Sequence, residues 1–378
     1  MNIAFYAPLK PIDHPVPSGD RAIANALQDA LRLAGHRVSV ASRLRSFDAR
    51  GDAQRQARLA RIGGCIAQRL VARWRRSDAP QLWFTYHLHH KAPDHVGLPA
   101  SRALGIPYVV AEASIAPSQR DGPWALGYEA AYEAIIAADN VVFVNPADVP
   151  EVRKARGLAA PFALLAPFVD TTCFGGAARR ARLAPPRPLR IVTVAMMREG
   201  AKLASYRLLA DALVRLGDTE FFLTIVGDGP ARPAVEAAFA PLAPRVAFAG
   251  ALAPAAIAAQ LLAGDLFAWP AIDEAIGIAF LEAQACGVPV VGADTPGVAG
   301  IVAAGRTGIL VAPGDPGAFA GALRRMLGDA ALRERMGAEA FAHVRAHHDV
   351  SSAARQLDAI LQDTLARNRR ADAATVPC

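Results

Sequence analysis

The sequence has few cysteines and no long apolar run. Its four cysteines (Cys65, Cys173, Cys286 and Cys378) are scattered, and no two of them form a CxxC pair. This spacing argues against a disulfide framework and a structural zinc site and is typical of a reducing compartment. A membrane-spanning helix requires an uninterrupted run of about 18 apolar residues, and the sequence has no such run. The first residues lack the basic region of a signal peptide, so we expect a cytoplasmic protein.

The composition is that of a globular protein with ample core material. Apolar residues make up 53% of the 378 residues and charged residues 20%, and this length fits two domains better than one. The net charge of +7 permits an anionic partner without requiring one, and we expect no nucleic-acid partner. No strand-like run is followed by GxGxxG with an acidic residue about 20 positions later, which disfavours an NAD-linked oxidoreductase.

Short β-branched runs alternate with amphipathic runs of helix length along the chain. This alternation is typical of βαβ units and parallel sheets, so the expected fold class is α/β. The expected strands are 3–7, 37–41, 82–86, 107–111, 140–144, 191–195, 221–227, 245–250, 265–270, 289–292 and 308–312.

A Gly-, Arg- and Pro-rich stretch interrupts the alternation near 175–190 and predicts a linker between two domains. We expect two Rossmann-like, doubly wound domains that face each other across a cleft, because ligands bind at the carboxyl ends of such strands. The expected division is 1–174, linker 175–189, 190–348, a terminal helix 349–370 and a disordered tail 371–378.

The apolar stretch "WPAIDEAIGIAFLEAQACGVPVVG" (269–292) contains two carboxylates, Glu274 and Glu282. Glu274 is expected in the loop after a buried strand, and Glu282 a little over one turn into the next helix. The free N–H groups at Gly277 and Ile278 would form an anion site at the helix start. A phosphate cradle beside two hydroxyl-accepting carboxylates suits a nucleotide sugar. Alone, the pattern also fits a helix with one Glu at its N-terminus, which the macrodipole stabilises, and one ordinary Glu in its middle.

Residues 270–297, "PAIDEAIGIAFLEAQACGVPVVGADTPG", resemble the hallmark of glycosyltransferase family 4, the retaining nucleotide-sugar enzymes with the GT-B fold. Further similar segments occur in the family's order. They are "PSGD" (17–20), "AGHRVSV" (34–40), "APFVDTTCF" (166–174), "VGDGP" (226–230), "RVAFAG" (245–250) and "GRTGILVAPGDPGAFAGAL" (305–323). The resemblance implies an N-terminal acceptor domain, a C-terminal donor domain, and a terminal helix that crosses back to the former.

The resemblance also implies donor-binding roles in the C-terminal domain. Glu282 would hold the ribose hydroxyls and Glu274 the donor-sugar hydroxyls. Ile276, Gly277 and Ile278 would line the diphosphate, with backbone N–H groups from the latter two. Gly227 and Gly229, in the turn after a strand, would also lie at the donor, and Gly19 would let the N-terminal loop approach the diphosphate.

Lys202 resembles the family's lysine that neutralises the departing diphosphate. Negative charge develops on this leaving group and must be stabilised by fixed cations. The sequence contains no DxD motif, so we expect neither a metal nor a cofactor. The arginine that the family places five residues earlier is replaced by Met197, and the adjacent Arg198 is a candidate substitute. Ala299 and Gly300 replace the family's Pro-Glu pair.

Two residues are candidates for the acceptor side. His87 ends an expected strand within "TYHLHHKAPDH" (85–95), a segment for which a metal cluster and ordinary surface histidines are alternatives. Glu112 lies roughly where the family often has a histidine, so that histidine is not carried over.

A basic amphipathic helix is expected over 53–76, with arginines opposite an apolar face. It is either a crossover helix packed on the N-terminal sheet or a peripheral contact with an anionic membrane or lipid-linked acceptor.

The predicted function is retaining, metal-independent transfer of a sugar from a nucleotide-diphosphate donor to a hydroxyl of a glycan or glycolipid. The alternatives are a GT-B nucleotide-sugar epimerase or phosphorylase, and a non-catalytic sugar-nucleotide-binding partner subunit.

Overall fold

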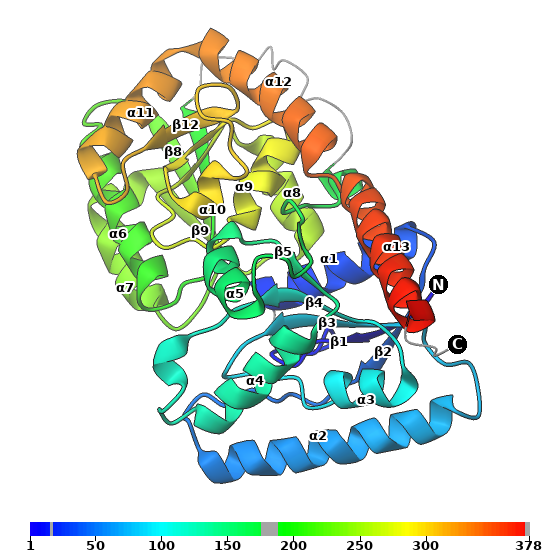
Figure 1. Ribbon diagram of the computed structural model, residues 1–378. Helices are drawn as coiled ribbons and strands as arrows, with labels where there is room; N and C mark the ends of the chain where they lie inside the picture. The colour runs from blue at the N-terminus through cyan, green and yellow to red at the C-terminus, as the bar shows by residue number, and fades with distance from the viewer. Residues whose placement is uncertain (16–17, 175–187, 375–378) are drawn as a thin grey trace. The chain divides into compact units, whose positions relative to one another are not determined.

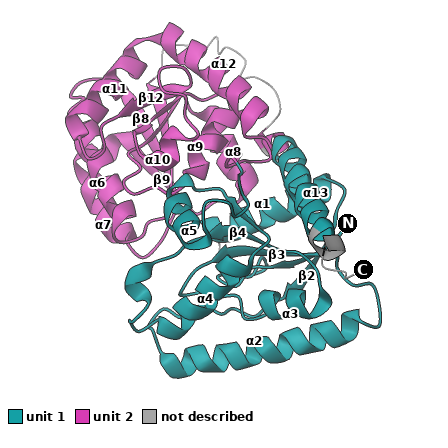
Figure 2. Ribbon diagram, viewed as in Figure 1, with its two compact units in different colours: residues 1–165, 350–378 teal, residues 166–349 magenta. Residues whose placement is uncertain are grey.

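The computed structural model describes residues 1–15, 18–174 and 188–374. They form two compact units (Figure 1, Figure 2). The N-terminal unit comprises residues 1–165 and the terminal helix from Val350, and the C-terminal unit comprises 166–349. Each unit is an α/β layer structure built on one parallel sheet.

The sheet of the N-terminal unit has the strand order β2-β1-β3-β4-β5-β6. Its strands are β1 (Asn2–Tyr6), β2 (Arg37–Ser42), β3 (Leu82–Leu88), β4 (Tyr108–Ala113), β5 (Asn140–Phe143) and β6 (Phe162–Leu164). The central strands are buried on both faces, as parallel sheets covered by helices require.

Helices cover both faces of this sheet: α2, α3 and α4 lie on one face, and α1 and α13 pack side by side on the other (Figure 1). The helices and 3-10 turns of this unit are α1 (Gly19–Leu33), α2 (Ala53–Trp74), α3 (Gly97–Leu104), η1 (Pro117–Gln119), α4 (Ala125–Ala137), η2 (Pro146–Asp148), α5 (Val149–Arg156) and α13 (Val350–Ala374). Asp52 caps α2 by accepting bonds from Gln54 N and Arg55 N. Because the apolar face of α2 packs inward, its arginines remain on the surface.

The sheet of the C-terminal unit has the order β12-β11-β10-β7-β8-β9. Its strands are β7 (Leu189–Val194), β8 (Phe221–Val226), β9 (Val246–Gly250), β10 (Leu266–Trp269), β11 (Val290–Ala293) and β12 (Gly308–Val311). The chain moves along the sheet in one direction from β7 to β9 and in the other from β10 to β12. Right-handed crossovers therefore place the helices of the two halves on opposite faces.

On one face α6 packs against α7 and α11, and on the other α9 packs against α8 and α12. The helices and 3-10 turns are η3 (Thr171–Phe174), α6 (Ala201–Val214), α7 (Arg232–Phe239), η4 (Ala240–Arg245), α8 (Pro254–Ala263), α9 (Ile278–Ala285), α10 (Pro296–Ala299), α11 (Pro316–Gly328) and α12 (Ala330–His347). A continuous apolar core joins both layers to the sheet.

The predicted α/β class and the predicted parallel strands are confirmed, and β6 is the strand that the sequence analysis missed. The units divide after Leu165 rather than after residue 174, because 166–174 belongs to the C-terminal unit. In that segment, Val169 N bonds to His348 O and Thr171 Oγ1 to Asp349 Oδ1 at 2.6 Å. Most of the expected linker, 175–187, lies outside the described residues.

The terminal helix predicted over 349–370 is α13, which packs on α1 of the N-terminal unit. It continues to Ala374, so the start of the expected tail at 371 is helical instead; 375–378 lies outside the described residues. None of the helices in the described part of the chain combines the length and hydropathy that a bilayer crossing requires.

Candidate functional site

An ion pair spans the point where the C-terminal sheet reverses its strand order. Strands β7 and β10 are neighbours, and their following segments lead in opposite directions; doubly wound sheets bind ligands at the carboxyl ends of strands that flank such a reversal. Lys202 enters from α6, after β7, and Glu274 from the loop after β10. The Lys202 Nζ pairs directly with Glu274 Oε2, and the two side chains are only 27% and 18% exposed.

Trp269, the last residue of β10, contacts both members of this pair. Its indole Nε1 donates to Glu274 Oε2 over 3.2 Å, and its ring centroid lies 5.6 Å from Lys202 Nζ. The ring packs edge-on against Tyr206 of α6, with centroids 4.8 Å apart. Glu274 therefore has one fixed neutral donor in addition to its cation.

The loop that carries Glu274 is held in a strained conformation. Ala271 and Asp273 have φ values of 55° and 53°, which non-glycine residues adopt rarely and mostly at functional sites. Ile272 N donates to Ser205 Oγ over 2.9 Å, which fixes the loop to α6. On its other side, a Cβ added to Gly297 would lie 2.4 Å from Glu274 O, so glycine permits α10 to approach the loop.

Helix α9 begins directly after this loop with an uncapped N-terminus. Gly277 is its N-cap residue, at φ 76°, and no side chain caps the first turn. Ile276 precedes the cap and Ile278 is the first helical residue, and the contact of both with a diphosphate stays a prediction. The free N–H groups of such a turn attract an anion.

Glu282 lies one turn into α9, and burial raises the pKa of its carboxyl to about 7. Among the described residues its side-chain carboxylate has no ion-pair or hydrogen-bond partner. A half-buried carboxylate without a partner is incompletely solvated, so a ligand that donates hydrogen bonds to it would be stabilised there.

Gly227 and Gly229 follow β8 and pack against the loop that leads to α6. A Cβ added to Gly227 would lie 1.8 Å from Ala195 O, and one added to Gly229 would lie 2.2 Å from Met197 O. Packing alone therefore requires glycine at both positions, and a direct donor contact stays a prediction.

The same loop explains the departure at Met197. The Met197 side chain is fully buried in the C-terminal core, so this position contributes an apolar side chain to the core instead of a charge to the site. Arg198 is exposed, and no described residue forms an ion pair or hydrogen bond with its guanidinium.

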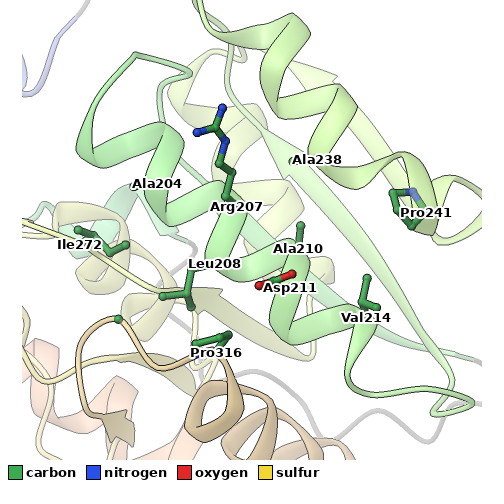
Figure 3. Close-up of a pocket in the computed structure, with 11 residues that line it drawn as sticks. Ala204, Arg207, Leu208, Ala210, Asp211, Val214, Ala238, Pro241, Ile272 and Pro316 are labelled. Atoms are coloured by element: carbon green, nitrogen blue, oxygen red, sulfur yellow. The ribbon is translucent and has the colours of Figure 1, made fainter.

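A surface cavity of about 660 Å³ lies against the outer side of α6 (Figure 3). Arg207 and Asp211 contribute its charged groups, and Ile272 and Pro316 part of its apolar wall. None of the predicted site residues lines this cavity, so it is separate from the candidate site.

The N-terminal sheet also has a side-chain pair at its reversal point, between β1 and β3. His87, at the end of β3, lies with Nδ1 3.0 Å from Oδ1 of Asp20, at the start of α1 after β1. His87 has φ 61° and Glu112, on the adjacent strand β4, has φ 56°. Two strained residues on neighbouring strands at one sheet edge are typical of a functional site.

Glu112 and Asp20 differ in their electrostatic surroundings. Burial raises the pKa of Glu112, although its Oε1 accepts bonds from Val144 N and Asn145 N. Burial alone would raise the pKa of Asp20, but the hydrogen bond and charge of His87 outweigh it, so that pKa is lowered. The edge thus combines an ionised carboxylate, an imidazole and a carboxyl that ionises less readily.

The remaining N-terminal predictions have mixed outcomes. Gly19 is the first residue of α1, and a Cβ added there would meet nothing within 4 Å, so packing does not require glycine and its donor role stays a prediction. The rings of His87 and His89 lie 5.1 Å apart. Within 1–15, 18–174 and 188–374, no three His, Cys, Asp or Glu side chains are grouped to hold a metal.

The sequence analysis missed Trp269 and Asp20. Both lie beside predicted residues, but their contacts depend on which strands are neighbours. The signal that could have found them is the strand order, because Asp20 and His87, like Lys202 and Glu274, follow strands that flank a reversal point.

Comparison with known proteins agrees with this geometry. Residues 188–329 match the family described as glycosyl transferases group 1. The match covers the segments that carry Lys202, Glu274 and Glu282 and does not extend into the N-terminal unit.

One curated relative is the D-inositol 3-phosphate glycosyltransferase of Streptomyces avermitilis. It is 30% identical over 288 residues, which cover 70% of this chain and 62% of the relative. The chain spans less than two thirds of the length of the first curated relatives that it matches.

Solved structures extend the similarity to both units. Sucrose-phosphate synthase from Thermosynechococcus elongatus has a TM-score of 0.74 and 19% identity, covering 97% of this chain and 99% of that one. HepE from Anabaena, in complex with UDP, has a TM-score of 0.72 and 18% identity, covering 96% and 100%. The chain therefore has the GT-B fold, as predicted.

Proposed function

We propose that this protein is a glycosyltransferase that moves a sugar from a nucleotide-diphosphate donor to a hydroxyl acceptor. The observation that carries the proposal is the Lys202–Glu274 pair at the sheet reversal, beside the uncapped start of α9. A cation, free N–H groups and a carboxylate at one point match a substrate with a diphosphate next to hydroxyls. The names of the relatives and the UDP bound by HepE support the same reading.

In this proposal each part of the donor substrate is bound by its own protein groups. The N–H groups at Gly277 and Ile278 and the Lys202 ammonium hold the diphosphate, Glu282 accepts from the ribose hydroxyls, and Glu274 accepts from the donor sugar. As the bond from the sugar to phosphate breaks, the negative charge that grows on the diphosphate is stabilised by Lys202. This arrangement requires no metal, so activity should survive a chelator.

We further propose that the transfer retains the anomeric configuration, as in glycosyltransferase family 4, which the 270–297 segment resembles. The nuclear magnetic resonance spectrum of the product reports this directly. An anomeric configuration opposite to that of the donor would reject retention while leaving transfer itself intact.

On the acceptor side, we propose that His87 and Glu112 contact the incoming hydroxyl. Their strained backbones at one sheet edge and the close contact of the His87 imidazole with the Asp20 carboxylate support this role. A His87→Asn variant should raise the KM for the acceptor and leave the affinity for the nucleotide unchanged. An equal loss for both ligands would instead indicate a folding defect.

We also propose a peripheral contact of α2 with anionic lipid. Arg58, Arg61 and Arg69 are exposed on this helix, whereas Leu59 and Leu70 are buried. At roughly 1 kcal/mol per basic residue near an anionic surface, docking would be weak and salt-sensitive. An Arg58→Glu/Arg69→Glu variant should lose co-sedimentation with anionic vesicles at low salt, whereas equal, negligible sedimentation of the wild type with anionic and neutral vesicles would reject the contact.

The test of the main proposal incubates the protein with UDP-, GDP-, ADP- and dTDP-sugars, with and without hydroxyl acceptors. Transfer that requires an acceptor is the expected result. Epimerised donor in the absence of acceptor would indicate an epimerase, sugar phosphate formed from a glycan and inorganic phosphate a phosphorylase, and tight nucleotide binding without turnover a non-catalytic partner subunit.

A further inference from the structure

The Lys202–Glu274 pair presents a difficulty for catalysis that Trp269 resolves. In the proposed reaction, Lys202 is needed at the diphosphate and Glu274 at the sugar, yet in the ligand-free protein they neutralise each other. When the diphosphate draws Lys202 away, Glu274 loses its only cation partner among the described residues. A carboxylate that is 18% exposed would then be free to turn toward solvent.

We propose that Trp269 is a positioning residue, whose indole N–H keeps Glu274 aimed at the donor sugar after Lys202 has moved to the diphosphate. This inference rests on the proposed glycosyl transfer. The indole Nε1 donates to Glu274 Oε2 over 3.2 Å, and Lys202 Nζ donates to the same oxygen. One oxygen thus stays fixed, and Oε1 remains available for a sugar hydroxyl.

The indole is itself held rigidly. Trp269 is 2% exposed and lies at the end of a strand that pairs with β11 on one side and with β7 on the other. Its ring contacts Tyr206 at a 71° interplanar angle, and the Tyr206 hydroxyl donates to Ala195 O over 2.7 Å. The direction of the indole N–H is therefore fixed by the packing of the core, as a positioning group requires.

The same ring assists the exchange of Lys202. Its centroid is 5.6 Å from Nζ, within the range of a cation–π contact. The ammonium therefore keeps a favourable neighbour while it moves between Glu274 and the diphosphate. Other charged groups near this site are few: Arg198 and Asp273 are exposed and have no partner among the described residues.

The test is a Trp269→Phe variant, which keeps an aromatic ring and removes the N–H, with Tyr206→Phe as the matched control in the same ring cluster. We expect kcat to fall about tenfold or more in Trp269→Phe, as the loss of one hydrogen bond to a charged group implies. The affinity for the free nucleoside diphosphate should change less than about twofold, because that ligand lacks the donor sugar that Glu274 would hold. Tyr206→Phe should leave kcat close to that of the wild type. A Trp269→Phe variant with wild-type kcat would overturn the inference.

A second readout does not depend on turnover. The sequence has four tryptophans, so tryptophan labelled with ¹⁵N gives few indole signals, and the one missing in Trp269→Phe identifies Trp269. Glu274→Gln should shift this signal, and so should a saturating nucleoside diphosphate that withdraws Lys202. If no donor supports transfer, the proposed function is wrong, and the indole signal then tests the contact of Trp269 with Glu274 by itself. An indole signal whose position does not change in Glu274→Gln would overturn the role of Trp269.

Discussion

Replacing Glu274 by Gln should have opposite effects on nucleotide binding and on turnover. In the ligand-free protein, Lys202 is paired with Glu274, so a diphosphate must break that pair before it gains the cation. The amide of glutamine keeps the size of the side chain and its hydrogen bond from Trp269 but removes the charge that competes for Lys202. A nucleoside diphosphate should therefore bind more tightly to Glu274→Gln than to the wild type.

The size of this gain follows from the exposure of the pair. Solvent-exposed ion pairs contribute roughly 0.2–1 kcal/mol, and side chains that are 27% and 18% exposed belong at the upper end of that range. A gain of about 1 kcal/mol corresponds to an approximately fivefold lower Kd. Turnover should fall, with a loss of about 2–4 kcal/mol in transition-state stabilisation, because the carboxylate that accepts a hydrogen bond from the reacting sugar is lost.

Isothermal titration calorimetry with the nucleoside diphosphate and steady-state transfer kinetics measure the two effects. Asp273→Asn is the matched control: it removes the same charge one residue earlier, from an exposed side chain. It should leave both quantities near their wild-type values. A Glu274→Gln variant that binds the nucleotide more weakly, in proportion to its loss of turnover, would refute the competition for Lys202.

Two further predictions concern pH and stability. Burial raises the pKa of the Glu282 carboxyl to about 7. Between the ordinary pKa of glutamate and this value, the folded protein keeps a proton that the unfolded chain has lost. Relative to Glu282→Gln, the folding stability of the wild type should therefore fall as the pH rises from about 4.5 to about 7, and then level off. Thermal unfolding across this range checks the trend, and a constant difference would contradict the raised pKa of this partnerless carboxyl. Gly227→Ala should destabilise the protein by about 2–4 kcal/mol, because its Cβ would lie 1.8 Å from Ala195 O. Gly217→Ala, which has φ 60° but nothing within 4 Å, should cost only about 1 kcal/mol in a urea titration, and equal costs would contradict the close approach of the loop.

The fold was largely predictable because parallel strands leave a clear signature. Strands such as β3 and β10 are buried on both faces, so they occur as continuous apolar runs between helix-length segments. β6 was missed because it is a three-residue edge strand whose exposed Phe162 and Leu164 give no periodic pattern. The boundary at Leu165 was missed because the pairing of 166–174 with residues near 348 is a contact between distant parts of the sequence.

The site was predictable in its residues and less so in its connections. The spacing of Glu274 and Glu282 in an apolar segment pointed to both carboxylates, and the helix start at Gly277 followed from the same segment. That Lys202 pairs with Glu274, and that Trp269 donates to the same oxygen, depends on β7 and β10 being neighbours. Met197 could not be interpreted from the sequence, since its burial follows from packing against β8 and its turn.

The central claim, that the Lys202–Glu274 crevice binds a nucleotide diphosphate, is tested most directly by thermal shift with UDP, GDP, ADP and dTDP on the wild type and on Lys202→Met. One nucleotide, supplied at about 100 times its Kd, should stabilise the wild type by about 2.7 kcal/mol, and the same concentration should stabilise Lys202→Met far less. A wild type that none of the four nucleotides stabilises, or a Lys202→Met variant stabilised as much as the wild type, would contradict this claim.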